Sequence, residues 1–310
     1  MKILKIDMNF KAEENSIIAL GNFDGVHTGH QKLIKQAIKR AKEKNIKASI
    51  LIFKENTEKT INGENSNKKL LTSNPYKYEI LQSLGIDLIY EIEFDEAFMK
   101  LDPLVFLNDF LYKNLKVMGI VVGYDYRFGY KAKGNLESLK SFAHKKNISL
   151  DIIEAYRKNG KIVSSTLIRS LVENGSVEEA GDLLGRPFAI IGKVSHGKNL
   201  GKKMGFPTAN IIPKKQYILP KYGVYDTDVI IDNKRYKAAT SVGNNPTFKN
   251  EGVKIEANIL DFNQDIYGKV IRVDFIKRLR DMLIFDNVEE LFEQIKKDVD
   301  IIRNRKTIDK

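Results

Sequence analysis

Residues 16–30 read SIIALGNFDGVHTGH, a short apolar run that passes through a glycine-rich turn to two histidines. The apolar run at 16–20 stops at Gly21 and predicts a buried strand. After the turn, apolar residues recur with helical spacing and lysines and arginines fall opposite them. The stretch therefore predicts a strand, a turn and a helix N-terminus, where free N–H groups suit phosphate.

The two histidines of this stretch stand out by their placement. His27 and His30 are three residues apart at the start of the predicted helix, so they can share one face. The chain contains only four histidines, and half of them fall in this turn. Imidazoles beside an α-phosphate can donate hydrogen bonds to a transition state that gathers charge there.

Downstream of the turn, predicted strands alternate with predicted helices. This order favours an α/β fold, with a mainly parallel sheet covered by helices on both faces. Ligands of such folds lie beyond the carboxyl ends of the strands. The further strands are expected at 47–53, 86–92, 117–122 and 149–153, and the further helices at 75–84, 103–113 and 136–146.

Near residue 186 the pattern changes to short β-like runs separated by Gly, Pro and Asn turns, which continue to Phe275. That spacing predicts an antiparallel β-barrel, followed by a last helix near 287–304. We expect two domains, 1–185 and 186–310, and 310 residues suffice for both.

Composition narrows the class of protein further. The absence of cysteine excludes disulfides, thiolate metal sites and Cys nucleophiles. No signal peptide and no run of about 18 apolar residues is found, so we expect a cytoplasmic protein without a membrane partner. The net charge of +12 suggests an anionic partner. Lysines outnumber arginines and are spread along the chain, which favours a solvated surface over a nucleic-acid site.

A second glycine-rich stretch, GKVSHGKNLGKKMGFPTAN, occupies residues 192–210. Thr208 and Asn210 are two residues apart, so in an extended chain their oxygens point to one face. A hydroxyl and an amide carbonyl are hard ligands that suit Mg²⁺. The stretch is not a Walker A loop, and on its residues alone a plain turn and a phosphate site remain alternatives.

The motifs together resemble a known family. GNFDGVHTGH is similar to the HxGH signature of nucleotidyltransferases, in the form found in prokaryotic bifunctional FAD synthetases. VVGYDYRFGYKAKGN at 121–135 resembles the VGxDFxFG segment of that family, and VSSTLIRSLVENG at 163–175 its SSTxIR motif. The resemblance implies a Rossmann-like nucleotidyltransferase sheet, with His27 and His30 catalytic and Asp125 and Arg127 on the flavin side. It implies nucleotide contacts from Gly21, Phe23, Asp24, Gly25, His27, His30, Ser165, Thr166 and Arg169.

The second half resembles riboflavin kinase. Residues 192–210 are similar to its GxVxxGxxxGxxxGxPTAN signature, SVGNNPTF at 241–248 to its IGxxPTF turn, and 267–285 to its closing segment. The resemblance implies Glu256 as the catalytic base and Arg280 as a flavin contact. It implies Mg²⁺ on Thr208 and Asn210, and nucleotide contacts from Gly197, Lys202, Gly205, Thr208 and Asn210.

Four positions depart from the family pattern. FKENTEKT at 53–60 lacks the usual Pro/His phrase, so ATP contacts from that loop are not expected. Lys202 and Asn245 stand where Arg is common, and Met282 replaces a frequent Glu. A salt bridge or flap that uses that Glu is not carried over.

The resemblance implies synthesis of FAD from riboflavin and ATP by way of FMN, with nucleotides and flavins as partners. The sequence leaves the oligomeric state open, and an oligomer is compatible with it. Three alternatives stay open. The first is another adenylyltransferase of the superfamily, which would lack the β domain. The second is a basic nucleic-acid-binding protein, against which the absence of an Arg-rich stripe speaks. The third is a degenerate member that keeps only the kinase.

Overall fold

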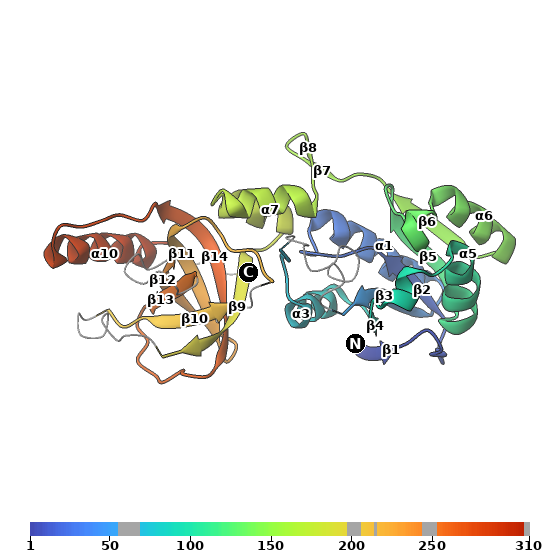
Figure 1. Cartoon of the computed structure of the whole chain (residues 1–310), viewed down its shortest axis with the longest axis horizontal. Coiled ribbons are helices and arrows are strands. Elements are labelled where there is room, and N and C mark those ends of the chain that lie inside the picture. Colours follow the sequence, from blue (N-terminus) through green and yellow to red (C-terminus); the bar gives the residue numbers. More distant parts are fainter. Residues whose placement is uncertain (55–68, 197–205, 214–215, 244–252, 307–310) are drawn as a thin grey trace. The chain divides into compact units, whose positions relative to one another are not determined.

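A computed structural model describes residues 1–54, 69–196, 206–213, 216–243 and 253–306. The chain forms two compact units, Met1–Ser164 and Ser165–Lys310 (Figure 1). The second compact unit includes the helices α7 (Ser165–Glu173) and α8 (Val177–Leu184). The domain boundary expected at 185/186 stays a prediction.

The first unit is built on a six-stranded parallel sheet, as expected. Its strand order is β1-β4-β3-β2-β5-β6, and every neighbouring pair is parallel. The chain winds outward from β2 through β3 to β4 and then returns to β5 on the other side of β2. Ligands in such sheets bind where the winding reverses, here at the carboxyl ends of β2 and β5. The strands are β1 Lys2–Ile6, β2 Ser16–Leu20, β3 Lys47–Phe53, β4 Leu88–Ile92, β5 Val117–Gly123 and β6 Ser149–Ile153.

Helices cover this sheet because its strands are apolar on both faces. The helix α1 (Thr28–Glu43) packs on β2, β3 and β5 through Leu33, Ile34, Ala37 and Ala41. Ile18 and Leu20 of β2 join a core with side chains of three other helices instead, since alternate residues face opposite ways. The remaining elements are α3 Asn74–Leu84, α4 Glu96–Met99, α5 Pro103–Val105, the π-helix η2 Phe106–Asn114, the 3₁₀ turn η3 Tyr130–Ala132, α6 Leu136–Lys146, β7 Arg157–Lys158 and β8 Lys161–Ile162.

The second unit contains a closed antiparallel barrel of order β10-β13-β12-β11-β14-β9, also as expected. The last helix, α10 (Val288–Arg303), packs on β12. Ile302 and Val299 of α10 form a small core with Leu260, which attaches the helix to the outside of the barrel. The strands are β9 Phe188–Ser195, β10 Ala209–Pro213, β11 Gly223–Ile231, β12 Lys234–Gly243, β13 Lys254–Ile259 and β14 Val270–Arg280.

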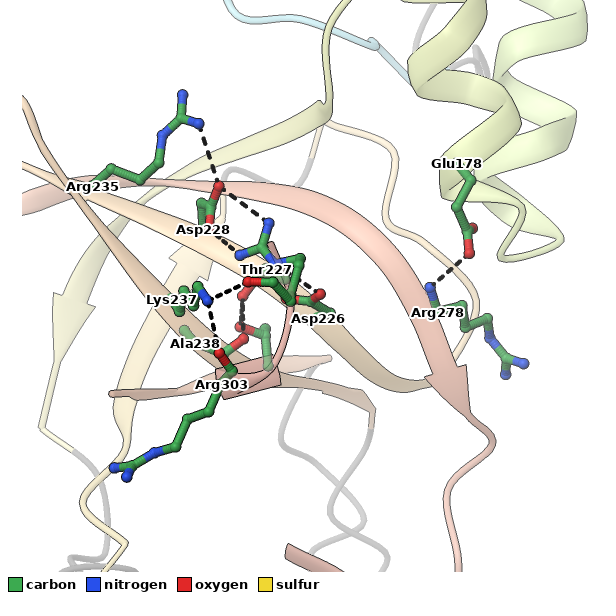
Figure 2. A network of polar contacts seen from close by, with 11 residues as sticks. Glu178, Asp226, Thr227, Asp228, Arg235, Lys237, Ala238, Arg278 and Arg303 are labelled. Carbon is green, nitrogen blue, oxygen red and sulfur yellow. Dashed lines mark hydrogen bonds and ion pairs between the residues drawn. The ribbon is translucent and has the colours of Figure 1, made fainter. Parts of the chain in front are cut away.

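The strand β11 is buried on both faces and carries charge on one of them (Figure 2). Thr227 bonds the hydroxyl of Thr240 at 2.7 Å. On the opposite face, Asp226 and Asp228 pair with Arg305, which follows α10; Arg305 Nε lies 3.0 Å from Asp226 Oδ2. Burial raises the pKa of Asp226 to about 6, although the charge of Arg305 acts to lower it.

The raised pKa of Asp226 gives a prediction for stability. An unfolded aspartate releases its proton near pH 4, whereas folded Asp226 keeps it to about pH 6. Stability supplied by this group is therefore lost as pH rises through that window. The variant Asp226→Asn has no carboxyl group at this position, so it does not lose this stability as the pH rises. Its melting temperature relative to the parent should therefore rise between about pH 4.5 and 7.5. Calorimetry of the full chain measures this, and a difference that is constant with pH contradicts it.

Candidate active sites of the two units

The turn that follows β2 has an unusual backbone. Phe23, Gly25 and Val26 all have positive φ, of 50°, 81° and 41°. For a β-branched residue such as Val26 this conformation is strained, and strain of this kind persists only where the surroundings enforce it. Asp24, 1% exposed, supplies one such restraint, because its carboxylate accepts hydrogen bonds from the N–H of Leu71 at 3.0 and 3.2 Å.

His27 is the N-cap of α1. Its Nδ1 accepts a hydrogen bond from the backbone N–H of His30 at 3.2 Å. A neutral His27 that accepts at Nδ1 carries its proton on Nε2. Gly29 makes room for this ring, since a Cβ there would lie 3.2 Å from its atoms.

His30 lies against His27 and is held as a neutral imidazole. The two rings stack with centroids 3.6 Å apart, and Phe23 meets His30 edge-on at 5.3 Å. Burial lowers the pKa of His30 well below its usual value, and the charges of His27 and Lys77 lower it further. Lys77 lies on the buried face of α3 and is 7% exposed. Lys77 is not among the residues predicted from the sequence. Its position on an otherwise apolar face of α3 could have indicated a buried lysine.

A pocket of about 640 Å³ opens beside His30 at the carboxyl ends of β2, β3 and β5. Gly21 and His30 line it together with Asp125 and Arg127, so the structure brings these four predicted residues into one cavity. The other walls are mainly apolar and include six aromatic side chains, which suits a flat ring system with polar edges. The aromatic residues are Phe53, Phe94, Phe98, Phe106, Tyr126 and Phe128. Most were missed from the sequence because they look like ordinary core residues.

The SSTxIR residues from Ser165 onward lie on α7, within the second unit, whereas Ser164 ends the first unit. Ser165 and Thr166 form the first turn of this helix, and Arg169 lies one turn further on its buried face. Their proposed contact with nucleotide phosphates stays a prediction.

The barrel carries a transverse row of polar residues. Asn210 of β10 lies directly opposite Glu256 of β13, and Glu256 lies opposite Ser241 of β12. Directly opposite residues share a face of the sheet. Their sequence neighbours Ile211 and Ile255 are buried inside the barrel, so the row faces outward. Ser241 is not among the predicted site residues, because its motif does not reveal the strand register that places it opposite Glu256.

The same row continues to Arg280. Ser241 pairs with Val224 of β11, and Val224 pairs with Arg280 of β14. The guanidinium of Arg280 bonds Asp298 of α10, with Nη2 2.7 Å from Oδ2 and Nε within 3.2 Å of both oxygens. Asp298 is 3% exposed. Arg280 thus anchors the last helix, and flavin binding by it stays a prediction.

Three predicted kinase residues, Gly197, Lys202 and Gly205, lie outside the described residues, as do Asn245 and residues 55–60 of the departing loop. Within the described ranges, no group of three or more His, Cys, Asp or Glu side chains is arranged to hold a metal ion.

No helix among the described residues is both long and apolar enough to span a bilayer.

A parallel sheet with paired histidines at its switch point, joined to a barrel with a PTAN strand, defines a two-unit nucleotide-dependent transferase. The FAD synthetase family matches residues 9–167, and the riboflavin kinase family matches residues 184–306. The chain belongs to the family of bifunctional riboflavin kinase/FMN adenylyltransferases.

Named relatives of this kind match nearly the whole chain. The bifunctional riboflavin kinase/FMN adenylyltransferase of Bacillus subtilis is 35% identical over 92% of this chain and 91% of its own length. That of Escherichia coli K12 is 31% identical over 92% and 91%. A crystal structure from Streptococcus pneumoniae, described as a macrolide-efflux protein, is 33% identical, covers 98% of this chain and 99% of that chain, and superposes with a TM-score of 0.89. The two-unit architecture is therefore shared with a solved structure.

The charge of Lys77 can be tested on His30 directly. Lys77→Met removes a positive charge that lowers the pKa of His30, so that pKa should move up towards its ordinary value. Burial and His27 remain, so the return should be partial. Histidine side-chain NMR across pH measures the shift, and Lys35→Met, an exposed change on α1, is the matched control. An unchanged His30 titration in Lys77→Met would show that this charge does not act on the ring.

Proposed function

We propose how the two units of this chain divide the synthesis of FAD. The chain phosphorylates riboflavin to FMN with its C-terminal riboflavin kinase domain. Its N-terminal domain then transfers the adenylyl group of ATP to FMN, which gives FAD and pyrophosphate. The observation that carries the proposal is the join of both family signatures in one chain, each on the fold that its chemistry uses.

In adenylyl transfer, an oxygen of the FMN phosphate attacks the α-phosphorus of ATP. The bond from that phosphorus to the bridging oxygen of the β-phosphate breaks, and pyrophosphate leaves with the electron pair. His27 and His30 donate hydrogen bonds to the α-phosphate oxygens, which gain charge in the transition state. The flavin ring occupies the aromatic pocket, with Asp125 and Arg127 at its polar edge. No covalent intermediate is required.

In the kinase reaction, Glu256 accepts the proton of the riboflavin 5′-hydroxyl as the oxygen attacks the γ-phosphorus, and ADP leaves. The oxygens of Thr208 and Asn210 are hard donors next to this base, so they fit Mg²⁺ that is also bound by the phosphates of ATP. That ion, when bound, neutralises charge on the transferred phosphoryl group.

The decisive experiment is to incubate the chain with riboflavin and MgATP and to separate FMN from FAD. Accumulation of FMN alone would identify a degenerate member that has lost adenylyl transfer, the alternative raised by the changed 53–60 loop. We expect FAD, because the pocket beside His30 retains its aromatic walls. Pyrophosphate release supplies an independent measure of the second step.

Glu256→Gln separates the two activities from the kinase side. The amide keeps the shape of the side chain but accepts a proton far less readily, so kinase turnover should fall by roughly 10²–10⁴. Conversion of supplied FMN to FAD should be nearly unchanged, because Glu256 lies in the other unit. An equal loss of both activities would argue against independent sites.

The converse variant changes both histidines. His27→Ala with His30→Ala removes two transition-state donors, and loss of even one such donor typically costs about 10²–10³ in rate. FAD formation from FMN should fall accordingly while riboflavin phosphorylation continues, and the kinase reports whether the chain is folded. Normal FAD formation by the double variant would refute the assignment of this site.

A further inference from the structure

Asn258 makes a contact that the proposed kinase reaction leaves unexplained. Its side-chain Nδ2 donates a hydrogen bond to the backbone carbonyl of Pro207 at 2.8 Å. Asn258 is 9% exposed and lies on β13, two residues after Glu256. Residues two apart on a strand share a face, so this amide lies on the same outer face as the proposed base.

The contact falls where the pairing of β10 with β13 ends. Ala209 pairs with Ala257 and Asn210 with Glu256, but Thr208 precedes β10 and pairs with no strand. Continued by one residue, the register would set Thr208 opposite Asn258. The side-chain amide of Asn258 thus binds the segment that precedes β10 to β13, one step beyond the last backbone pair of the two strands. At this point the chain enters β10 from the glycine-rich stretch.

A fixed Pro207 carbonyl restrains Thr208 directly. The carbonyl of Pro207 and the N–H and Cα of Thr208 belong to one planar peptide group. When Asn258 holds the oxygen of that group, it sets the direction in which Thr208 leaves it. Asn210 needs no such help, because its backbone is paired with β13 and β9 on both sides.

We propose that Asn258 is a positioning residue of the kinase site, which holds Thr208 in register with Asn210 and Glu256. Asn258 acts through the Pro207–Thr208 peptide and touches no reacting atom. The inference rests on the proposed role of Thr208 and Asn210 in holding Mg²⁺ with ATP. Groups that orient metal ligands in this way typically change metal affinity or activity by about 10–100-fold when they are removed.

The test compares Asn258→Ala and Asn258→Asp in the full chain. Alanine removes the amide, and aspartate keeps its shape but replaces the donor with an oxygen that repels the carbonyl. In both variants the Mg²⁺ concentration for half-maximal kinase rate should rise by about tenfold or more, and kcat/KM for ATP should fall with it. The KM for riboflavin and the conversion of FMN to FAD should stay near the parent values. Asn263→Ala, an exposed amide beyond the same strand, is the matched control.

The outcomes separate this inference from the proposal beneath it. An unchanged Mg²⁺ requirement in Asn258→Asp would overturn the positioning role. A parallel fall of every kinase parameter together with the melting temperature would overturn it as well, because that pattern marks a structural residue. Thr208→Ala tests the foundation: if its Mg²⁺ requirement matches the parent, the assignment of Thr208 as a metal ligand fails, whatever Asn258 does.

Discussion

The hydrogen bonds from the Leu71 N–H to the Asp24 carboxylate restrain the turn that leads to His27 and His30. They fix the buried Asp24 side chain within the turn after β2. The same turn contains Val26, whose positive φ is strained. The turn delivers His27 to the first position before α1, where the ring caps the helix and so orients itself. The Asp24 carboxylate thus has a structural contact within the fold, and its predicted contact with the nucleotide stays a prediction.

In the barrel, the strand register positions the candidate site residues, as the turn after β2 does in the first unit. A closed barrel leaves each strand two partners, so one shift of β10 against β13 would turn Asn210 away from Glu256. Buried Ile211 and Ile255 forbid that shift, because it would expose them. The apolar interior of the barrel therefore aligns the polar row on its outside. The Arg280–Asp298 pair ties α10 to the end of the same row.

The sequence was most informative where pattern and motif coincide. Alternating strands and helices predicted the parallel sheet, short β runs predicted the barrel, and spacing predicted that His27 and His30 share a face. The helix expected at 103–113 is largely a π-helix, Phe106–Asn114, and at its end the Asn114 amide donates a hydrogen bond to the carbonyl of Met8 at 2.8 Å. The strand β1 and the partner of Arg280 were also missed. Both depend on contacts between residues far apart in the chain, which periodicity does not encode.

The two sites differ because their nucleophiles differ. The FMN phosphate is already an anion at neutral pH, so adenylyl transfer needs no base; it needs donors for the charge that gathers on the α-phosphate. In the proposed reaction the stacked imidazoles of His27 and His30 are donors of that kind, and burial and the charge of Lys77 lower the pKa of His30. The riboflavin hydroxyl is a poor nucleophile and must lose a proton as it attacks, and the row of the barrel presents a carboxylate instead. Under the proposed assignment, each unit supplies the catalytic group that its own substrate lacks.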